Sequence, residues 1–184
     1  PATMIAKCQS PAPENQFLSQ VMGFYLREVN VYREVASQLT IRVPTPYFVD
    51  AAPDGLPFIL LIEEITGARC PDQIAGLTPG DATKILDVVA RLHASYWNSP
   101  LLDEMPWLPP MNNPLYKGGQ DMALARFPAF ADRFGERIGP AMMATIERAC
   151  NHYCDMLDHV VAQGHVTFTH TDCRAENYLF GGSA

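Results

Sequence analysis

The sequence predicts an α+β protein in which a small, strand-bearing part precedes a larger, mostly helical part. Short apolar runs rich in β-branched residues are concentrated near the start, at residues 2–7, 46–51 and 57–64. Apolar residues at helical spacing recur within residues 77–98 and 121–164. Strands and helices are therefore segregated rather than alternating, which argues against a doubly wound parallel sheet.

The first part is expected to hold three strands and one helix. Residues 2–7 form a short strand that ends in Lys7, and two prolines make residues 10–16 a turn-rich loop. Apolar residues then recur at every third or fourth position from 17 to 39, which is typical of a helix. The last strand, 57–64, is apolar almost throughout, as expected for a strand buried on both faces.

The second part is expected to be a series of helices. A connector at residues 65–76 differs in composition from both sides, so we place a lobe boundary at its start, with residues 1–64 in one lobe and 65–184 in the other. The elements predicted after it are a helix within 77–98 capped by Thr78 or Asp81, a loop at 99–117, two short helices divided at Pro128 within 121–135, and a helix at 140–164 ended by Gly164.

Composition excludes some classes of function. The formal net charge is −7, so we expect no nucleic-acid partner. No apolar run approaches the roughly 20 residues that cross a bilayer, so we expect no membrane span. Five scattered cysteines indicate reduced thiols and a cytoplasmic location. A metal site at Cys150, His152 and Cys154 is not favoured, because no second ligand pair stands at zinc spacing.

We also expect the chain to be a fragment of a longer protein. It begins with PATMIAK, inside an apparent strand, and ends with LFGGSA, just after another strand has begun. Both ends are therefore expected to be incomplete.

A polar loop stands between two apolar runs within residues 165–182. His170, Asp172 and Asn177 form the pattern H-x-D-x-x-x-x-N, and the flanking runs are expected to be short strands. An aspartate can accept a hydroxyl proton, and an asparagine five residues later can hold a divalent cation through its amide oxygen. Phosphoryl transfer needs both functions a few ångströms apart. The pattern alone is equally compatible with an ordinary polar turn.

Lys7 and Glu28 supply a second constellation. The lysine ends the first strand, and the glutamate lies on the helix that follows. A lysine that pairs with a helix glutamate and reaches the phosphates of a nucleotide is the other half of kinase chemistry. Glu34 is a rival partner, but its six-residue separation places it on the far side of the helix. The alternative is that Lys7 is a solvated strand end and Glu28 lies on a solvated helix face.

Together these motifs make the chain resemble the aminoglycoside phosphotransferase superfamily, which includes choline kinases and ecdysteroid-kinase-like proteins. The segments that carry the resemblance are MIAK, FYLREVNVYREVA, PFILLIEEI, VVARLHASYW and THTDCRAENYLF, in that order along essentially the whole chain. The resemblance implies a bilobal, protein-kinase-like fold that is incomplete at both ends here. A partial nucleotide-binding lobe would be followed by a partial helical lobe with the catalytic loop.

The resemblance also implies transfer of the γ-phosphate of ATP to a hydroxyl group of a small molecule, with Mg²⁺ as the metal. Asp172 would be the catalytic base, Asn177 the magnesium ligand, and His170 the brace of the loop that completes the catalytic set. The residues implied to bind the nucleotide are Lys7, Glu28 and the hinge residues Ile62, Glu63, Glu64 and Ile65.

The chain departs from the family pattern in three places. Thr171 stands where the family usually has glycine. The strands before the lysine are missing, and so is the second magnesium-binding aspartate after the loop. The chain alone is therefore expected to be inactive. One alternative is a degenerate nucleotide-binding or scaffolding domain on the same fold, and another is an unrelated helical domain, in which Lys7 and Glu28 would lie apart.

Overall fold

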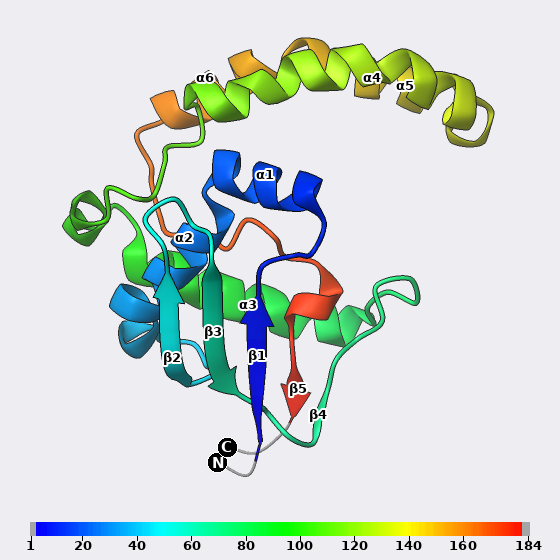
Figure 1. Cartoon of the computed structure of the whole chain (residues 1–184). Helices are drawn as coiled ribbons and strands as arrows, with labels where there is room; N and C mark the ends of the chain where they lie inside the picture. The colour runs from blue at the N-terminus through cyan, green and yellow to red at the C-terminus, as the bar shows by residue number, and fades with distance from the viewer. Residues whose placement is uncertain (1–2, 182–184) are drawn as a thin grey trace. The chain divides into compact units, whose positions relative to one another are not determined.

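The computed structural model describes residues 3–181, and it consists of two compact units that we describe separately (Figure 1). Unit 1 comprises Pro1–Trp107 and Thr167–Ala184, and unit 2 comprises Leu108–Val166. The structure mixes helices with small sheets, as an α+β fold requires. The lobe boundary predicted after residue 64 falls inside unit 1, and the division into lobes stays a prediction.

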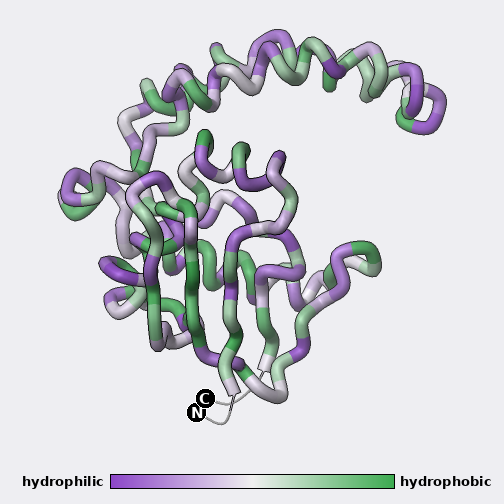
Figure 2. The backbone as a smooth tube through the Cα atoms, viewed as in Figure 1, coloured by the Kyte–Doolittle hydropathy of each residue, from purple (hydrophilic) through white to green (hydrophobic). Residues whose placement is uncertain are grey.

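A three-stranded antiparallel sheet forms the first part of unit 1. Its strands are β1 (Met4–Cys8), β2 (Pro46–Ala51) and β3 (Phe58–Glu63), in the order β1-β3-β2. The three predicted strands are thus confirmed, although residue 2 of the first lies outside the described residues. Figure 2 colours the central strand, β3, as mostly apolar.

Helix α2 (Phe24–Asn30) packs on one face of this sheet. Val29 of the helix and Phe58 and Leu60 of β3 are almost fully buried, and the ring of Tyr25 stacks on that of Phe58 with 4.5 Å between centroids. Alternate residues of a strand share a face, so Phe58 and Leu60 point toward α2 together. These residues form an apolar core between α2 and the sheet.

The single helix predicted for residues 17–39 is divided. Helix α1 (Pro13–Met22) ends at Gly23, whose φ of 66° is left-handed and suits glycine, and α2 follows at once. A π-helical turn (Val31–Val35) and a 3₁₀ turn (Ala36–Gln38) complete the segment. The loop predicted at residues 10–16 is wrong from Pro13 onward, because proline is well tolerated in the first turn of a helix.

The rest of unit 1 contains helix α3 (Pro79–Tyr96) and a short pair of strands, one from the connector and one from near the end of the chain. Helix α3 is capped as predicted by Thr78, whose hydroxyl accepts from the Asp81 N–H. Strand β4 (Ala68–Arg69) pairs with β5 (Phe180–Gly181), which lies next to it in Figure 1. The strand predicted just before the polar loop is wrong. That segment is irregular, and the Thr167 hydroxyl donates to the carbonyl of His93 at 2.6 Å.

Unit 2 consists of three helices, α4 (Pro114–Ile138), α5 (Pro140–Asn151) and α6 (Tyr153–Ala162). The predicted break at Pro128 is wrong, because α4 runs through it. An interior proline removes one backbone hydrogen bond and crowds the preceding turn, and packing of α4 along α5 offsets that cost. The helix predicted for 140–164 is interrupted at His152, which is not helical. No helix within residues 3–181 is long and apolar enough to cross a bilayer.

Candidate functional site

Strand β1 and helix α2 bring Lys7 and Glu28 together. The Lys7 ammonium lies 2.6 and 2.8 Å from the two carboxylate oxygens of Glu28. Lys7 is directly opposite Leu60 in the sheet, and paired residues share a face. Its side chain therefore extends from the face of the sheet that α2 covers. The predicted pair is therefore present. The role of the pair in binding phosphates stays a prediction.

Glu34, the rival partner, is engaged elsewhere. Its carboxylate accepts a hydrogen bond from the Trp107 indole at 2.7 Å. Tyr32 lies four residues after Glu28. Burial and the charge of Glu28 raise the pKa of its phenol to about 12. The phenol therefore stays neutral beside the ion pair, and the preference for Glu28 over Glu34 agrees with the structure.

The polar loop is tied together by two hydrogen bonds of its own residues. The Asp172 N–H donates to His170 Nδ1 at 3.3 Å, and the Asn177 side-chain amide donates to the Asp172 carbonyl at 2.8 Å. The first bond ties the His170 ring to the backbone of the loop, and the bracing role of His170 stays a prediction. The second uses the amide nitrogen of Asn177 and leaves its Oδ1 atom as an acceptor.

The carboxylate of Asp172 is about half exposed. The Arg174 Nε atom lies 3.7 Å from one of its oxygens. Burial, the Cys173 side chain and the charge of Asp172 all raise the pKa of the nearby Tyr178 phenol above its usual value. An accessible carboxylate beside a neutral phenol and a guanidinium can accept a proton from a hydroxyl group that approaches from solvent.

Thr171 adopts a left-handed backbone conformation, with a φ of 63°. Glycine occupies this region freely, whereas a β-branched residue is strained in it. The loop therefore keeps a conformation suited to glycine although the chain carries threonine there. The departure from the family pattern thus coincides with a strained backbone at residue 171.

The four predicted hinge residues divide into two pairs. Ile62 and Glu63 are the last residues of β3, and Glu64 and Ile65 follow it. The Glu63 N–H already donates to the carbonyl of Thr45 at 2.8 Å. Its carboxylate is bonded to Arg42 at 2.6 Å and to the Thr45 N–H. The Arg42 bond, aided by the Thr45 bond, lowers the Glu63 pKa to about 2. The backbone N–H and the carboxylate of Glu63 are thus both already bonded within the protein.

The connector makes contacts with the loop region that sequence reasoning missed. Arg69 forms two 2.9 Å bonds with the buried carboxylate of Asp81, and its guanidinium lies over the Phe180 ring, 4.8 Å from the centroid. Gln73 accepts from the Ala175 N–H at 2.9 Å. Gln73 and Ala175 are separated by 102 positions, and Arg69 and Phe180 lie still further apart, so no local spacing rule relates these partners.

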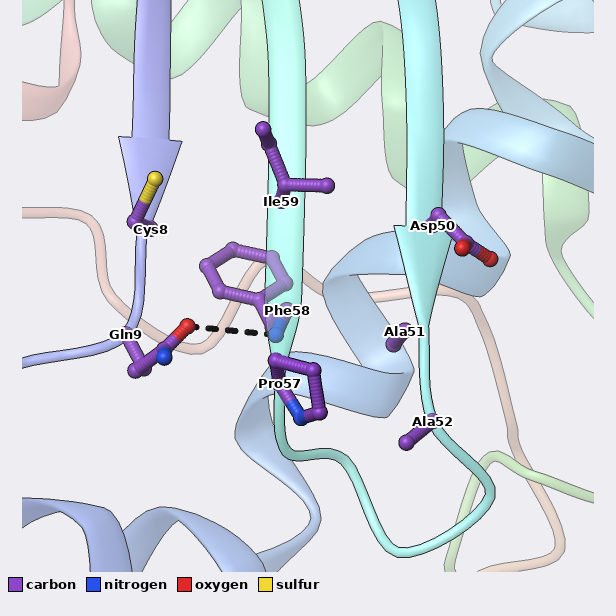
Figure 3. Close-up of a pocket in the computed structure, with 8 residues that line it drawn as sticks. All are labelled: Cys8, Gln9, Asp50, Ala51, Ala52, Pro57, Phe58 and Ile59. Carbon is purple, nitrogen blue, oxygen red and sulfur yellow. Dashed lines mark hydrogen bonds between the residues drawn. The ribbon is translucent and has the colours of Figure 1, made fainter.

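A cavity of about 450 Å³ lies at one end of the three-stranded sheet (Figure 3). Gln9 closes one side, because its side-chain oxygen accepts from the Phe58 N–H at 3.2 Å. None of the predicted site residues lines it. The lining residues are Cys8, Gln9, Asp50, Ala51, Ala52, Pro57, Phe58 and Ile59.

The oxygen of Asn177 fits the chemistry of Mg²⁺, which prefers hard oxygen ligands and completes its shell with water and substrate phosphates. Asn177 Oδ1 would hold the ion, and the ion would supply charge neutralisation for the phosphates. Within residues 3–181, no group of three or more His, Cys, Asp or Glu side chains is arranged to hold a metal.

Comparison with known proteins gave one match. The family model described as "Phosphotransferase enzyme family" matches residues 18–184, which includes Glu28 and the loop and leaves Lys7 outside the matched region. Comparisons with curated proteins and with solved structures gave no match. Because the match covers most of the sequence, it confirms the resemblance to the aminoglycoside phosphotransferases and their protein-kinase-like relatives. The chain belongs to the phosphotransferase enzyme family.

Proposed function

We propose that the protein is an ATP- and magnesium-dependent kinase that transfers the γ-phosphate to a hydroxyl group of a small molecule. The observation that carries the proposal is the Lys7–Glu28 ion pair at 2.6 Å, in the same compact unit as the loop with Asp172 and Asn177. The two constellations supply the two requirements of phosphoryl transfer, which are a cation for the phosphates and a base beside a metal ligand. The family match supports the same class of reaction.

Each residue then has one role. Lys7 neutralises the α- and β-phosphates of ATP, and Glu28 fixes the direction of its ammonium group. Asp172 accepts the proton of the attacking hydroxyl group, and Asn177 holds the magnesium ion. Because the N–H of Glu63 is already bonded within the protein, adenine is bound by the backbone that follows, at Glu64 and Ile65.

A degenerate nucleotide-binding domain on the same fold is the second candidate. The observation that favours it is the strained backbone of Thr171 beside the proposed base. Such a domain would bind nucleotide through Lys7 and Glu28 without measurable turnover. Both candidates predict nucleotide binding, so turnover separates them.

The test compares Asp172→Asn with Lys7→Ala in the protein expressed from the complete coding sequence. The readouts are ATP turnover with water as acceptor and affinity for AMP-PNP. Asp172→Asn should lower turnover by about 10²–10⁴-fold, the usual contribution of a general base, while AMP-PNP affinity is retained. Lys7→Ala should weaken AMP-PNP binding by about tenfold, because it removes a charge-assisted contact with phosphate.

Unit 2 offers matched controls, because Lys117 and Asp158 form an ion pair of the same 2.6 Å length. Lys117→Ala and Asp158→Asn should leave both readouts unchanged. Turnover of Asp172→Asn within about threefold of the parent would remove Asp172 from its role. A parent protein that binds AMP-PNP without any turnover would favour the degenerate domain.

A further inference from the structure

The turn that carries Asn177 lacks a cap of its own. Residues Ala175–Asn177 form a single 3₁₀ turn, and the residue before it, Arg174, makes no side-chain hydrogen bond to it. The first N–H groups of any helical turn have no partner within the turn. The N–H of Ala175 is such a group, and Ala175 is buried, with only 6% of its surface exposed. A buried N–H without a partner is costly, so this one needs an acceptor from elsewhere.

Gln73 of the connector supplies that acceptor. Its side-chain oxygen lies 2.9 Å from the Ala175 nitrogen, across 102 positions of sequence. Next to it, the Cys70 thiol donates to the carbonyl of Glu176 at 3.4 Å. The connector therefore bonds to consecutive residues of the turn, one through its N–H group and the other through its C=O group.

The position of Asn177 depends on this turn. Its N–H donates to the Arg174 carbonyl at 3.1 Å, which closes the turn, and its side-chain amide donates to the Asp172 carbonyl. If the start of the turn moves, the Asn177 side chain moves with it.

We propose that Gln73 is a positioning residue that caps the turn from a distance and thereby fixes the Asn177 oxygen for the metal ion. The proposal rests on the proposed function for the metal, whereas the capping itself is independent of it. Outer residues that orient a metal ligand typically contribute 10–100-fold to metal affinity. Gln73 acts through Asn177 and touches neither nucleotide nor acceptor.

The test uses two substitutions of similar size in the full chain. Gln73→Met removes the acceptor oxygen, and Gln73→Glu keeps one. Gln120→Met is the matched control, because Gln120 accepts from the Cys154 N–H at 2.8 Å in unit 2, which contains no part of the loop. Two readouts are taken. One is amide hydrogen exchange at residues 175–178 without ligand, and the other is the Mg²⁺ concentration that gives half-maximal AMP-PNP binding.

Gln73→Met should speed exchange at residues 175–178 by about tenfold, because the capping bond is lost. It should also raise the half-saturating Mg²⁺ concentration by about tenfold while AMP-PNP affinity at saturating Mg²⁺ is kept. Gln73→Glu should restore both values to near the parent, and Gln120→Met should change neither. A purely structural role would lower stability in Gln73→Met and Gln120→Met alike without moving the Mg²⁺ requirement.

Unchanged exchange in Gln73→Met would overturn the proposal, and so would faster exchange with an unchanged Mg²⁺ requirement. Failure of the proposed function looks different. In that case AMP-PNP binding by the parent would not depend on Mg²⁺ at all, and the exchange measurement would still decide whether Gln73 holds the turn.

Discussion

The two halves of the proposed site are held in place by different forces. Lys7 and Glu28 stand beside an apolar core in which a helix covers one face of a sheet. Asp172 and Asn177 lie on an exposed loop held by single polar bonds, some within the loop and two from the side chains of Gln73 and Cys70 in the distant connector. Apolar packing is spread over many weak contacts, whereas the loss of a single polar bond removes one specific restraint. Substitutions in the core beside Lys7 and Glu28 should therefore lower the stability of the whole fold. Substitutions that remove the polar bonds of the loop should have local effects.

The largest expected effect comes from the core. Leu60→Ala should lower the free energy of unfolding by about 2–5 kcal/mol, because Leu60 is fully buried opposite Lys7. Leu61→Ala is the control, since that side chain lies on the opposite face and is only partly buried. Urea denaturation measures both. Equal losses for the two variants would contradict the assignment of the core to the α2 face.

A smaller and local effect is expected at Arg69. Arg69→Met removes the bonds to the buried Asp81 carboxylate and the contact with the Phe180 ring. The thermal midpoint should fall by less than in Leu60→Ala, and amide exchange should quicken at residues 178–181.

Arg33→Met is the control for Arg69, because its ion pair with Asp50 is exposed and such pairs contribute little. If amide exchange in the Arg69→Met variant increased uniformly throughout unit 1, Arg69 would give residues 178–181 no local support.

Thr171→Gly should stabilise the protein slightly. Relief of left-handed strain contributes about 1–2 kcal/mol, and the greater flexibility of unfolded glycine costs roughly 0.5–1 kcal/mol. The net gain measured by urea denaturation should therefore lie between zero and about 1.5 kcal/mol. Thr171→Ala retains a Cβ atom and should gain little. If glycine destabilises the protein, the left-handed conformation of residue 171 is not strained.

The smallest effect is expected from acid. The bonds to Arg42 and Thr45 hold the folded pKa of Glu63 at about 2, below its ordinary value of 4.5. A lowered carboxyl pKa stabilises the folded state above the unfolded value, so this contribution is complete above about pH 4.5 and is lost as the pH falls toward 2. Glu63→Gln should flatten the dependence of the unfolding midpoint on pH in that range. An unchanged slope would show that the Arg42 bond is not maintained in solution.

The sequence predicted the parts of the molecule that follow from local patterns. Alternation and continuous apolar runs gave the three strands, and the lysine–glutamate pair followed from the order of strand and helix. Helix ends were less predictable, because Pro13 and Pro128 are compatible with helix and only packing decides. His152, with no strong helix-breaking character, interrupts a segment whose periodicity continues past it.

The support of the loop could not be predicted in this way. Gln73 and Arg69 belong to a connector that shows no periodicity and no motif. Their importance comes from pairing with residues about 100 positions later, and one sequence contains no signal for such a pairing. The prediction of a strand before the loop was wrong for a related reason, because Thr167 bonds to helix α3 instead of to a neighbouring strand.

The separation of 102 residues between Gln73 and Ala175 also sets an order of events during synthesis. At about 5–20 residues per second, the ribosome adds the turn roughly 5–20 s after the connector. All of unit 2 is made in that interval, because its residues lie between them in the chain. The strands and α2 can pack early through contacts made near the start of the chain, whereas the loop can be shaped only after unit 2 has been translated. A nascent chain can therefore form its lysine–glutamate pair before its polar loop has been made, and a ribosome that stalls within unit 2 would leave a protein with the first half of the proposed site and without the second.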